Sequence, residues 1–279
     1  MNRVLIRVIG APLLLAGLGL CVYADYARST TTAVTVLMGC FAALSFHELC
    51  AMARLKGLHP AEWLGLAAIV VNFAAVLGVG DASPTQVQRL SVLIFLGLNL
   101  LLLVFTRYTP LDAGFTFLAG QYVLLLLFIA FDPGGGGPEW LFWLLFLVAT
   151  NKGSDMAAYI VGKAIGRHKL APAVSPNKTW EGSIAGLIAG AVLGSVVLNH
   201  WRARIGPESF DELALLPILA IAAAVTVAAQ LGDLVKSAVK RWAGVKDSGR
   251  FLPEFGGALD MVDSFILSAP VAALLMSQR

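Results

Sequence analysis

The sequence predicts an all-α fold, a polytopic transmembrane helical bundle with about nine spans. Composition is the first reason: 58% of the 279 residues are hydrophobic, only 13% are charged, and the mean hydropathy is +0.80. A soluble domain of this length would carry more charge on its surface. The second reason is that apolar runs of bilayer-spanning length, about 20 residues each, recur along the whole chain. The third is that Lys and Arg gather in alternate connections between these runs.

The candidate spans follow one another with short polar connections. The first has a basic start and could be a cleaved signal peptide, but its length and the pattern that continues after it favour an uncleaved span. The fifth is short, and the sixth and ninth carry polar residues. The predicted spans cover residues 4–23, 32–52, 62–80, 89–106, 115–131, 139–161, 181–199, 213–233 and 259–277.

The distribution of basic residues predicts the orientation. With the amino terminus inside, the inside segments hold fourteen Lys and Arg and the outside segments hold five. Because cytoplasmic connections are enriched in these residues, the loops around 163–180 and 236–257 should both face the cytoplasm. We therefore expect an integral protein of a bacterial inner membrane, with cytoplasmic loops that form its active site.

The two halves of the chain differ in polarity. Residues 1–135 form spans rich in Leu, Val and Ala, which we interpret as a membrane scaffold, whereas residues 136–279 carry three polar segments and are predicted to be the catalytic region. The scaffold contains one polar exception. His47-Glu48 begins like an HExxH zinc motif, but Ala51 stands where the second His would be, so a metalloprotease site is excluded. We expect Glu48 to be paired within the bundle.

The first polar segment covers residues 150–182. Lys152 and Asp155 are three apart, so they share a helix face and could pair. The following loop is basic, which ordinary positive-inside topology and attraction to anionic lipid would also explain. SPNKTWEG is more specific, because several donors fall into one predicted turn before a span. Donors and free amides at a helix start suit phosphate; the donors are Ser175, Asn177, Lys178 and Thr179.

The second polar segment, residues 230–249, follows the eighth predicted span. If the helix continues, Asp233, Lys236 and Lys240 lie on one face. These three charges could simply neutralise one another. That alternative does not explain why Lys246 and Asp247 follow immediately.

The third polar segment opens the last span. Asp260 and Asp263 are three residues apart, so their carboxylates point to one side of a helix, behind the flexible pair Gly256-Gly257. Two carboxylates at close range in a low dielectric repel each other unless a cation lies between them. Oxygen ligands without His or Cys favour a hard cation such as Mg²⁺, and a second cation remains open. The rival interpretation is pairing with Lys or Arg from the eighth span.

The three segments together favour a membrane enzyme that handles phosphates. Carboxylates for magnesium, basic residues and phosphate donors on one face fit chemistry on a phosphorylated or nucleotide substrate. The alternative is a transporter or a non-catalytic relative whose charges pair internally. Transporters often show broken spans in both halves, whereas the polar breaks here fall only in the second half.

One stretch, SAVKRWAGVKDSGRFLPEFGGALDMVD, resembles the C-terminal motif of the phosphatidate cytidylyltransferases, also called CDP-diglyceride synthases. Upstream, SDMAAYIVGKAIGRHKLAPAVSPNKTWEG and Gly232-Asp233 are also similar to that family. Twelve positions match the C-terminal motif in register: Ser237, Lys240, Arg241, Lys246, Asp247, Gly249, Leu252, Pro253, Gly256, Gly257, Asp260 and Asp263. The sequence departs from the family at Phe255, where His is usual, at Met261, where Arg is usual, and at Ala258, Met156 and Ala157.

The resemblance implies an activity: CTP and phosphatidate give CDP-diacylglycerol and pyrophosphate, with magnesium. It implies these roles for the matched residues and their neighbours: metal ligands Asp233, Asp260, Asp263 and Asp155; catalytic groups Lys240, Arg241, Lys246 and Asp247; and substrate-binding groups Ser175, Asn177, Lys178, Lys236, Gly256 and Gly257. The expected partners are CTP, phosphatidate and membrane lipids, with no nucleic acid; a homodimer stays open. The alternative acceptor is another lipid phosphate.

Overall fold

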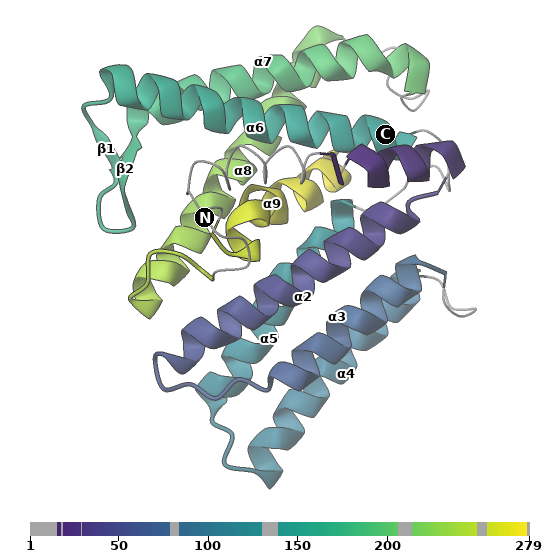
Figure 1. The fold of residues 1–279 in the computed structure, drawn as a ribbon, viewed down its shortest axis with the longest axis vertical. Coiled ribbons are helices and arrows are strands. Elements are labelled where there is room, and N and C mark those ends of the chain that lie inside the picture. Colours follow the sequence, from purple (N-terminus) through teal and green to yellow (C-terminus); the bar gives the residue numbers. More distant parts are fainter. Residues whose placement is uncertain are drawn as a thin grey trace. The chain divides into compact units, whose positions relative to one another are not determined.

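The computed structural model describes residues 16–17, 19–28, 30–78, 84–129, 139–205, 214–249 and 256–277. Most of these residues are helical (Figure 1). The elements, in chain order, are α2(Thr32–Arg54), α3(Glu62–Val76), α4(Pro84–Phe105), α5(Pro110–Leu124), the 3₁₀ helix η1(Leu125–Ile129), α6(Glu139–Ile165), β1(Lys169–Ala171), β2(Ser175–Thr179), α7(Trp180–Ile205), α8(Leu215–Ala243) and α9(Ala258–Ser277).

The chain forms two compact units. The first unit comprises Met1–Ala130 and Trp242–Val262, and the second comprises Phe131–Arg241 and Asp263–Arg279. The motif loop, which we define as residues 244–257 between α8 and α9, and the first turn of α9 thus belong with the amino-terminal helices. The predicted division at residue 135 concerns scaffold and catalytic roles, and it stays a prediction.

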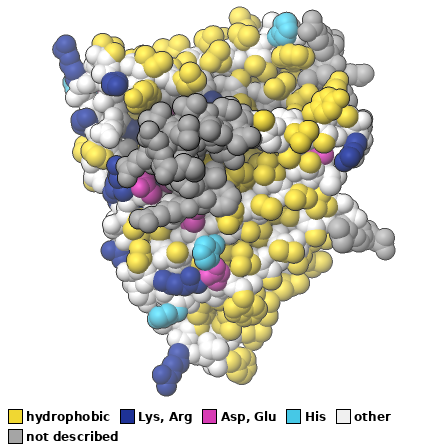
Figure 2. All heavy atoms as spheres, in the orientation of Figure 1, with side chains coloured by type: hydrophobic (Ala, Val, Ile, Leu, Met, Phe, Trp, Pro, Cys, Tyr) yellow, Lys and Arg dark blue, Asp and Glu magenta, His cyan; other side chains and the backbone are white. Residues whose placement is uncertain are grey.

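Six of the described helices are long and apolar enough to cross a membrane, and they confirm a helical membrane protein: Thr32–Arg54, Gln86–Phe105, Pro110–Ile129, Trp180–Trp201, Leu215–Ala243 and Ala258–Leu275. Figure 2 shows one face of the molecule, on which hydrophobic side chains (yellow) are widespread. The predicted count of nine is not confirmed. α3 has 15 residues, and the polar α6 is not among the six, although both lie where spans were predicted. Most of the predicted first span, 4–23, lies outside the described residues.

A two-stranded hairpin is an exception to the predicted all-α fold. β1 and β2 pair antiparallel, with Lys169 opposite Thr179 and Ala171 opposite Ser175. The prediction of one turn over Ser175–Thr179 was therefore wrong. Side chains alternate sides along a strand, so Lys178 points away from the side that its neighbours Asn177 and Thr179 share. In Figure 1 the hairpin projects from the adjoining ends of α6 and α7.

In the first unit, aromatic rings fill spaces that glycines leave open. The Phe46 side chain, which is fully buried, packs against Gly65, and the Phe95 ring packs against Gly120.

Buried carboxylates of the first unit lie close to backbone N–H groups near helix starts. Asp25 accepts hydrogen bonds from the Ala33 and Val34 amides at 2.9 and 2.8 Å. These contacts fix the beginning of α2, because the first amides of a helix lack intrahelical acceptors.

In the second unit, small residues bring α6 and α7 close together. A methyl group added at Gly186 would lie 2.9 Å from the Ser154 carbonyl oxygen and 3.0 Å from the Ala158 side chain. Close approach of this kind is typical of helix pairs in membranes, where dispersion replaces the hydrophobic effect. The close α6–α7 pair therefore fixes the position of the β1–β2 hairpin, which connects the two helices and carries polar residues.

Gly186→Ala should destabilise the protein by about 1–3 kcal/mol, because the methyl group overpacks the α6–α7 contact. The matched control is Gly97→Ala on α4, where no atom lies within 4 Å of the added methyl group. That change should stabilise by up to about 1 kcal/mol through helix propensity. Thermal unfolding of the two purified variants in detergent measures both effects, and equal shifts would contradict the packing argument.

Candidate active site

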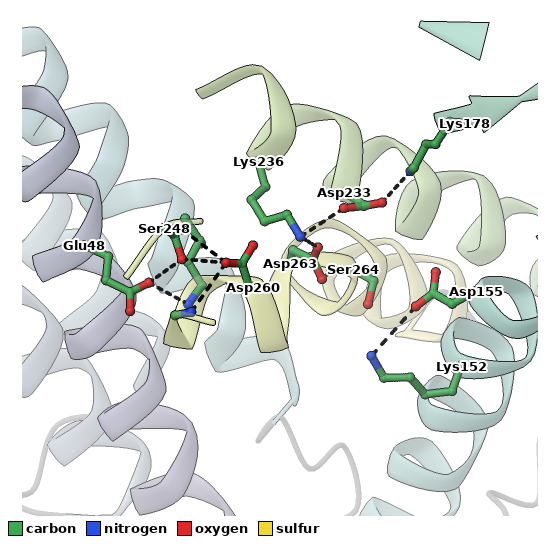
Figure 3. A network of polar contacts seen from close by, with 12 residues as sticks. Glu48, Lys152, Asp155, Lys178, Asp233, Lys236, Ser248, Asp260, Asp263 and Ser264 are labelled. Atoms are coloured by element: carbon green, nitrogen blue, oxygen red, sulfur yellow. Dashed lines mark hydrogen bonds and ion pairs between the residues drawn. The ribbon is translucent and has the colours of Figure 1, made fainter. Parts of the chain in front are cut away.

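In the second unit, two lysines and two aspartates form a continuous series of ion pairs. The Lys178 ammonium lies 2.5 Å from one oxygen of Asp233, and the Lys236 ammonium lies 3.0 Å from the other. Lys236 also contacts the carboxylate of Asp263. Figure 3 shows this series, in which Lys178 comes from β2, Asp233 and Lys236 from α8, and Asp263 from α9. We call these four residues the charge array.

Local structure explains how the charge array forms. α8 continues to Ala243, beyond the predicted end at 233, so Asp233 and Lys236 lie one turn apart on a single helix, as predicted. Gly232 lets α9 approach, because an added methyl group there would lie 2.6 Å from the Asp263 carbonyl oxygen. The hairpin then brings Lys178 to the free side of Asp233.

The inner part of the array is buried. The Lys236 side chain is 8% exposed and that of Asp263 is 9% exposed, while Asp233 and Lys178 are about one quarter exposed, at 24% and 28%. An isolated charge at such a position would cost several kcal/mol, and a close partner of opposite sign offsets that cost. The two lysines and two aspartates therefore hold one another in place.

A second ion pair lies nearby in the same unit. Lys152 and Asp155 on α6 are 3.8 Å apart, which confirms the pairing predicted from their spacing. Asp155 also interacts electrostatically with Asp233, Lys178 and Lys236. Three of the predicted metal ligands are thus grouped with three lysines, so the formal charges of the group cancel.

In the first unit, Asp260 lies in a different network. One of its oxygens accepts from the Ser248 amide and hydroxyl, both at 3.1 Å, and from the Gly257 amide at 3.4 Å. The Ser248 hydroxyl also lies 2.7 Å from the carboxylate of Glu48 on α2. Figure 3 shows Ser248 between the two carboxylates. This confirms that Glu48 is paired within the bundle.

The glycine pair before α9 is required by this network. Gly256 has a φ of 87°, a left-handed conformation that favours glycine. An added methyl group at Gly257 would collide with the Ser248 hydroxyl and the Glu48 carboxylate. Both glycines were predicted to bind substrate; their observed surroundings are side chains of the protein, and the substrate role stays a prediction.

The other predicted residues lie at the ends of these elements. Arg241 donates from Nε to the Val174 carbonyl at 3.2 Å, which links α8 to the hairpin turn. Ser175 and Asn177 are on β2, and Asn177 is exposed. Lys240 is half-buried on α8, whereas Lys246 and Asp247 are exposed in the turn that follows it. Arg250 and the departure at Phe255 lie outside the described residues.

Magnesium binding is left as a prediction. Within the described ranges, no three His, Cys, Asp or Glu side chains gather as a ready metal site. The rival interpretation of the aspartates, pairing with a lysine from the eighth span, applies to Asp263 through Lys236. Asp233 and Asp260 belong to different units, so their predicted joint coordination is not tested.

Ser248 was not predicted to take part in the site. This residue occupies an unspecified position of the motif, between Asp247 and Gly249, so no residue preference drew attention to it. The partner of Glu48 was missed as well, because the two residues are 200 positions apart. The available signal was the cost of a lone carboxylate in a span, which indicates a partner without identifying it.

Lys236→Met should lower the free energy of unfolding by about 3–5 kcal/mol, because it leaves Asp263 buried without its ammonium. Adding Asp263→Asn should restore part of that loss. The matched control is Lys152→Met, which breaks a half-exposed pair and should cost about 1 kcal/mol. Denaturation of the detergent-solubilised protein checks the series. Equal losses for Lys236→Met and Lys152→Met would contradict the argument that burial makes the pairs of the array costlier to break.

Comparison with known proteins agrees with the motif resemblance. The sequence model of the cytidylyltransferase family matches residues 3–278. The phosphatidate cytidylyltransferase of Staphylococcus haemolyticus is 32% identical over 252 residues, which cover 87% of this chain and 93% of the relative. Those of Staphylococcus saprophyticus and Staphylococcus aureus are 35% and 33% identical over 77% and 69% of this chain, and 77% and 70% of their own lengths. The chain belongs to the cytidylyltransferase family.

Proposed function

We propose that the protein is a membrane-embedded phosphatidate cytidylyltransferase, which makes CDP-diacylglycerol and pyrophosphate from CTP and phosphatidate. Family membership across residues 3–278 supports the activity, and six apolar helices support access to a lipid substrate. The observation that carries the proposal is the charge array, because three of its four residues, Lys178, Asp233 and Asp263, fall within the segments that resemble the family. The excess of inside Lys and Arg supports an inner-membrane protein of about nine spans whose active site faces the cytoplasm.

The acceptor requires little acid–base help. The second pKa of a phosphate monoester is near 6, so phosphatidate is largely a dianion at neutral pH. One of its oxygens attacks the α-phosphorus of CTP, and the bond from that phosphorus to the bridging oxygen breaks. Pyrophosphate leaves with the electron pair. The protein must bring two anions together and offset the charge on the leaving group.

Lys178 and Lys236 are suited to that task. Each ammonium group lies beside a carboxylate in the structure, so positive charge is already localised at the array. A lysine can exchange one anion for another because its side chain is long and flexible. Arg241, tied to the hairpin turn, and Lys240 on the same helix would add positive charge beside them.

The aspartates can bind magnesium only if the lysines paired with them move to other anions. Asp233, Asp263 and Asp155 offer oxygen ligands, which Mg²⁺ prefers, but each is paired with a lysine. Bound magnesium would neutralise phosphate charge and polarise the reacting phosphoryl group. We expect the lysines to turn to CTP phosphates, which frees the carboxylates for the metal. The fourth ligand predicted from the sequence, Asp260, belongs to the first unit and is tested by its own substitution.

This exchange predicts that CTP and Mg²⁺ bind cooperatively. Either one alone should raise the unfolding temperature of the purified protein slightly, because neither can satisfy both the freed lysines and the freed carboxylates. Both together should raise it by more than the sum of the separate shifts, since binding to the native state stabilises it. The extra shift should disappear in Asp233→Asn. A full shift with Mg²⁺ alone would contradict the exchange.

The activity itself is tested by incubating the detergent-solubilised protein with CTP, Mg²⁺ and phosphatidate and measuring CDP-diacylglycerol. Asp233→Asn and Asp260→Asn should each lower the rate at least about 100-fold, the scale for losing a preorganised electrostatic group. Asp112→Asn is the matched control, because this buried carboxylate caps α5.

Three results would revise the proposal. Full activity of Asp260→Asn would remove that residue from the metal site. Product from a polyprenyl phosphate but not from phosphatidate would change the acceptor. The loss of the usual Arg at Met261, which removes one positive charge beside Asp260, gives reason to test that second acceptor. No product from either lipid would favour a non-catalytic relative.

A further inference from the structure

We infer that Glu48 is a positioning residue for the reaction: from α2, it holds the start of α9 and, through Ser248, the carboxylate of Asp260. This inference rests on the proposed function, because Asp260 matters here as a group of the active site. Glu48 accepts hydrogen bonds from the Ala258 amide at 2.8 Å, the Leu259 amide at 3.0 Å and the Ser248 hydroxyl at 2.7 Å. Ala258 and Leu259 are the first two residues of α9.

The contact is an unusual form of helix capping. The first amides of a helix need acceptors from outside it, and a residue just before the helix normally supplies one. In this protein the acceptor comes from another helix, 210 positions away in sequence. Glu48 is only 7% exposed. Its negative charge is therefore stabilised by the positive end of α9 in a place of low dielectric, where the interaction is strong.

Ser248 connects this cap to Asp260. Its hydroxyl has one proton, so it can donate to only one of the two carboxylates at a time. The shorter contact, 2.7 Å, is to Glu48, against 3.1 Å to Asp260. The Ser248 amide donates to Asp260 in either case, at 3.1 Å. Glu48 thus fixes the hydroxyl of Ser248, and the backbone of the same residue orients Asp260.

The glycines of the motif support the same interpretation. A methyl group added at Gly249 or at Gly257 would collide with the Glu48 carboxylate. Both positions match the family motif, and both face a side chain from α2. The space that these glycines leave open is therefore filled by Glu48, which assigns them to the support of Asp260.

The test is Glu48→Gln, which keeps the size of the side chain but loses its charge and one acceptor. One amide oxygen cannot accept all three hydrogen bonds, and the NH₂ group would face a donor. We expect kcat to fall at least tenfold while KM for CTP changes less than threefold. Asp260 should then be misplaced, and hydrogen exchange at the amides of residues 258–262 should become faster.

Two further variants separate positioning from stability. Asp112→Asn makes the same change in another buried cap of the first unit; it should lower the unfolding temperature and leave kcat unchanged. Ser248→Ala should lower kcat about tenfold, and adding Glu48→Gln should reduce it little further, because both act through one connection. If Glu48→Gln fails to fold, Ser248→Ala alone decides.

The outcomes are distinct. A wild-type kcat in folded Glu48→Gln, or in Ser248→Ala, would overturn the inference while leaving the proposed function intact. Multiplicative losses in the double variant would also overturn it, since they would mean independent roles. Absence of product from the unmodified protein would instead overturn the proposed function.

Discussion

The constraint on which this structure depends is that each buried carboxylate among the apolar helices needs a partner. A charge in such surroundings must meet an opposite charge or several hydrogen-bond donors. The two units solve this in different ways. In the first, Asp25 and Glu48 accept backbone amides at the starts of α2 and α9. In the second, Asp233 and Asp263 meet the ammonium groups of lysines.

These two solutions suit different tasks. Backbone amides at a helix start cannot leave their positions, so a carboxylate held by them becomes part of the framework. A lysine side chain is long and flexible, and its ammonium can exchange one anion for another. The lysine-paired aspartates of the second unit are therefore suited to a site that must accept a charged substrate, whereas Glu48 is suited to keeping the motif loop in place.

Much of the fold could be predicted from the sequence because it follows from local patterns. Apolar runs located α2 and α7 to α9 to within a few residues, apart from the carboxyl ends of α7 and α8, which extend beyond the predicted spans. Residue spacing gave the Lys152–Asp155 and Asp233–Lys236 pairs. The hairpin was missed because five residues that include Pro176 give little strand signal. Glu48 and Ser248 were not connected, because a contact over 200 positions leaves no trace in spacing.

The length of α8 has a consequence for how the lipid is reached. Its 29 residues extend over about 43 Å, whereas the hydrocarbon layer is about 30 Å thick. The excess of roughly two turns corresponds to the polar end that carries Lys236, Lys240 and Arg241. A phosphatidate headgroup at the membrane surface would lie at the depth of such an overhang. In the proposed reaction the acyl tails would then stay in the bilayer, and only CTP and pyrophosphate would move through water.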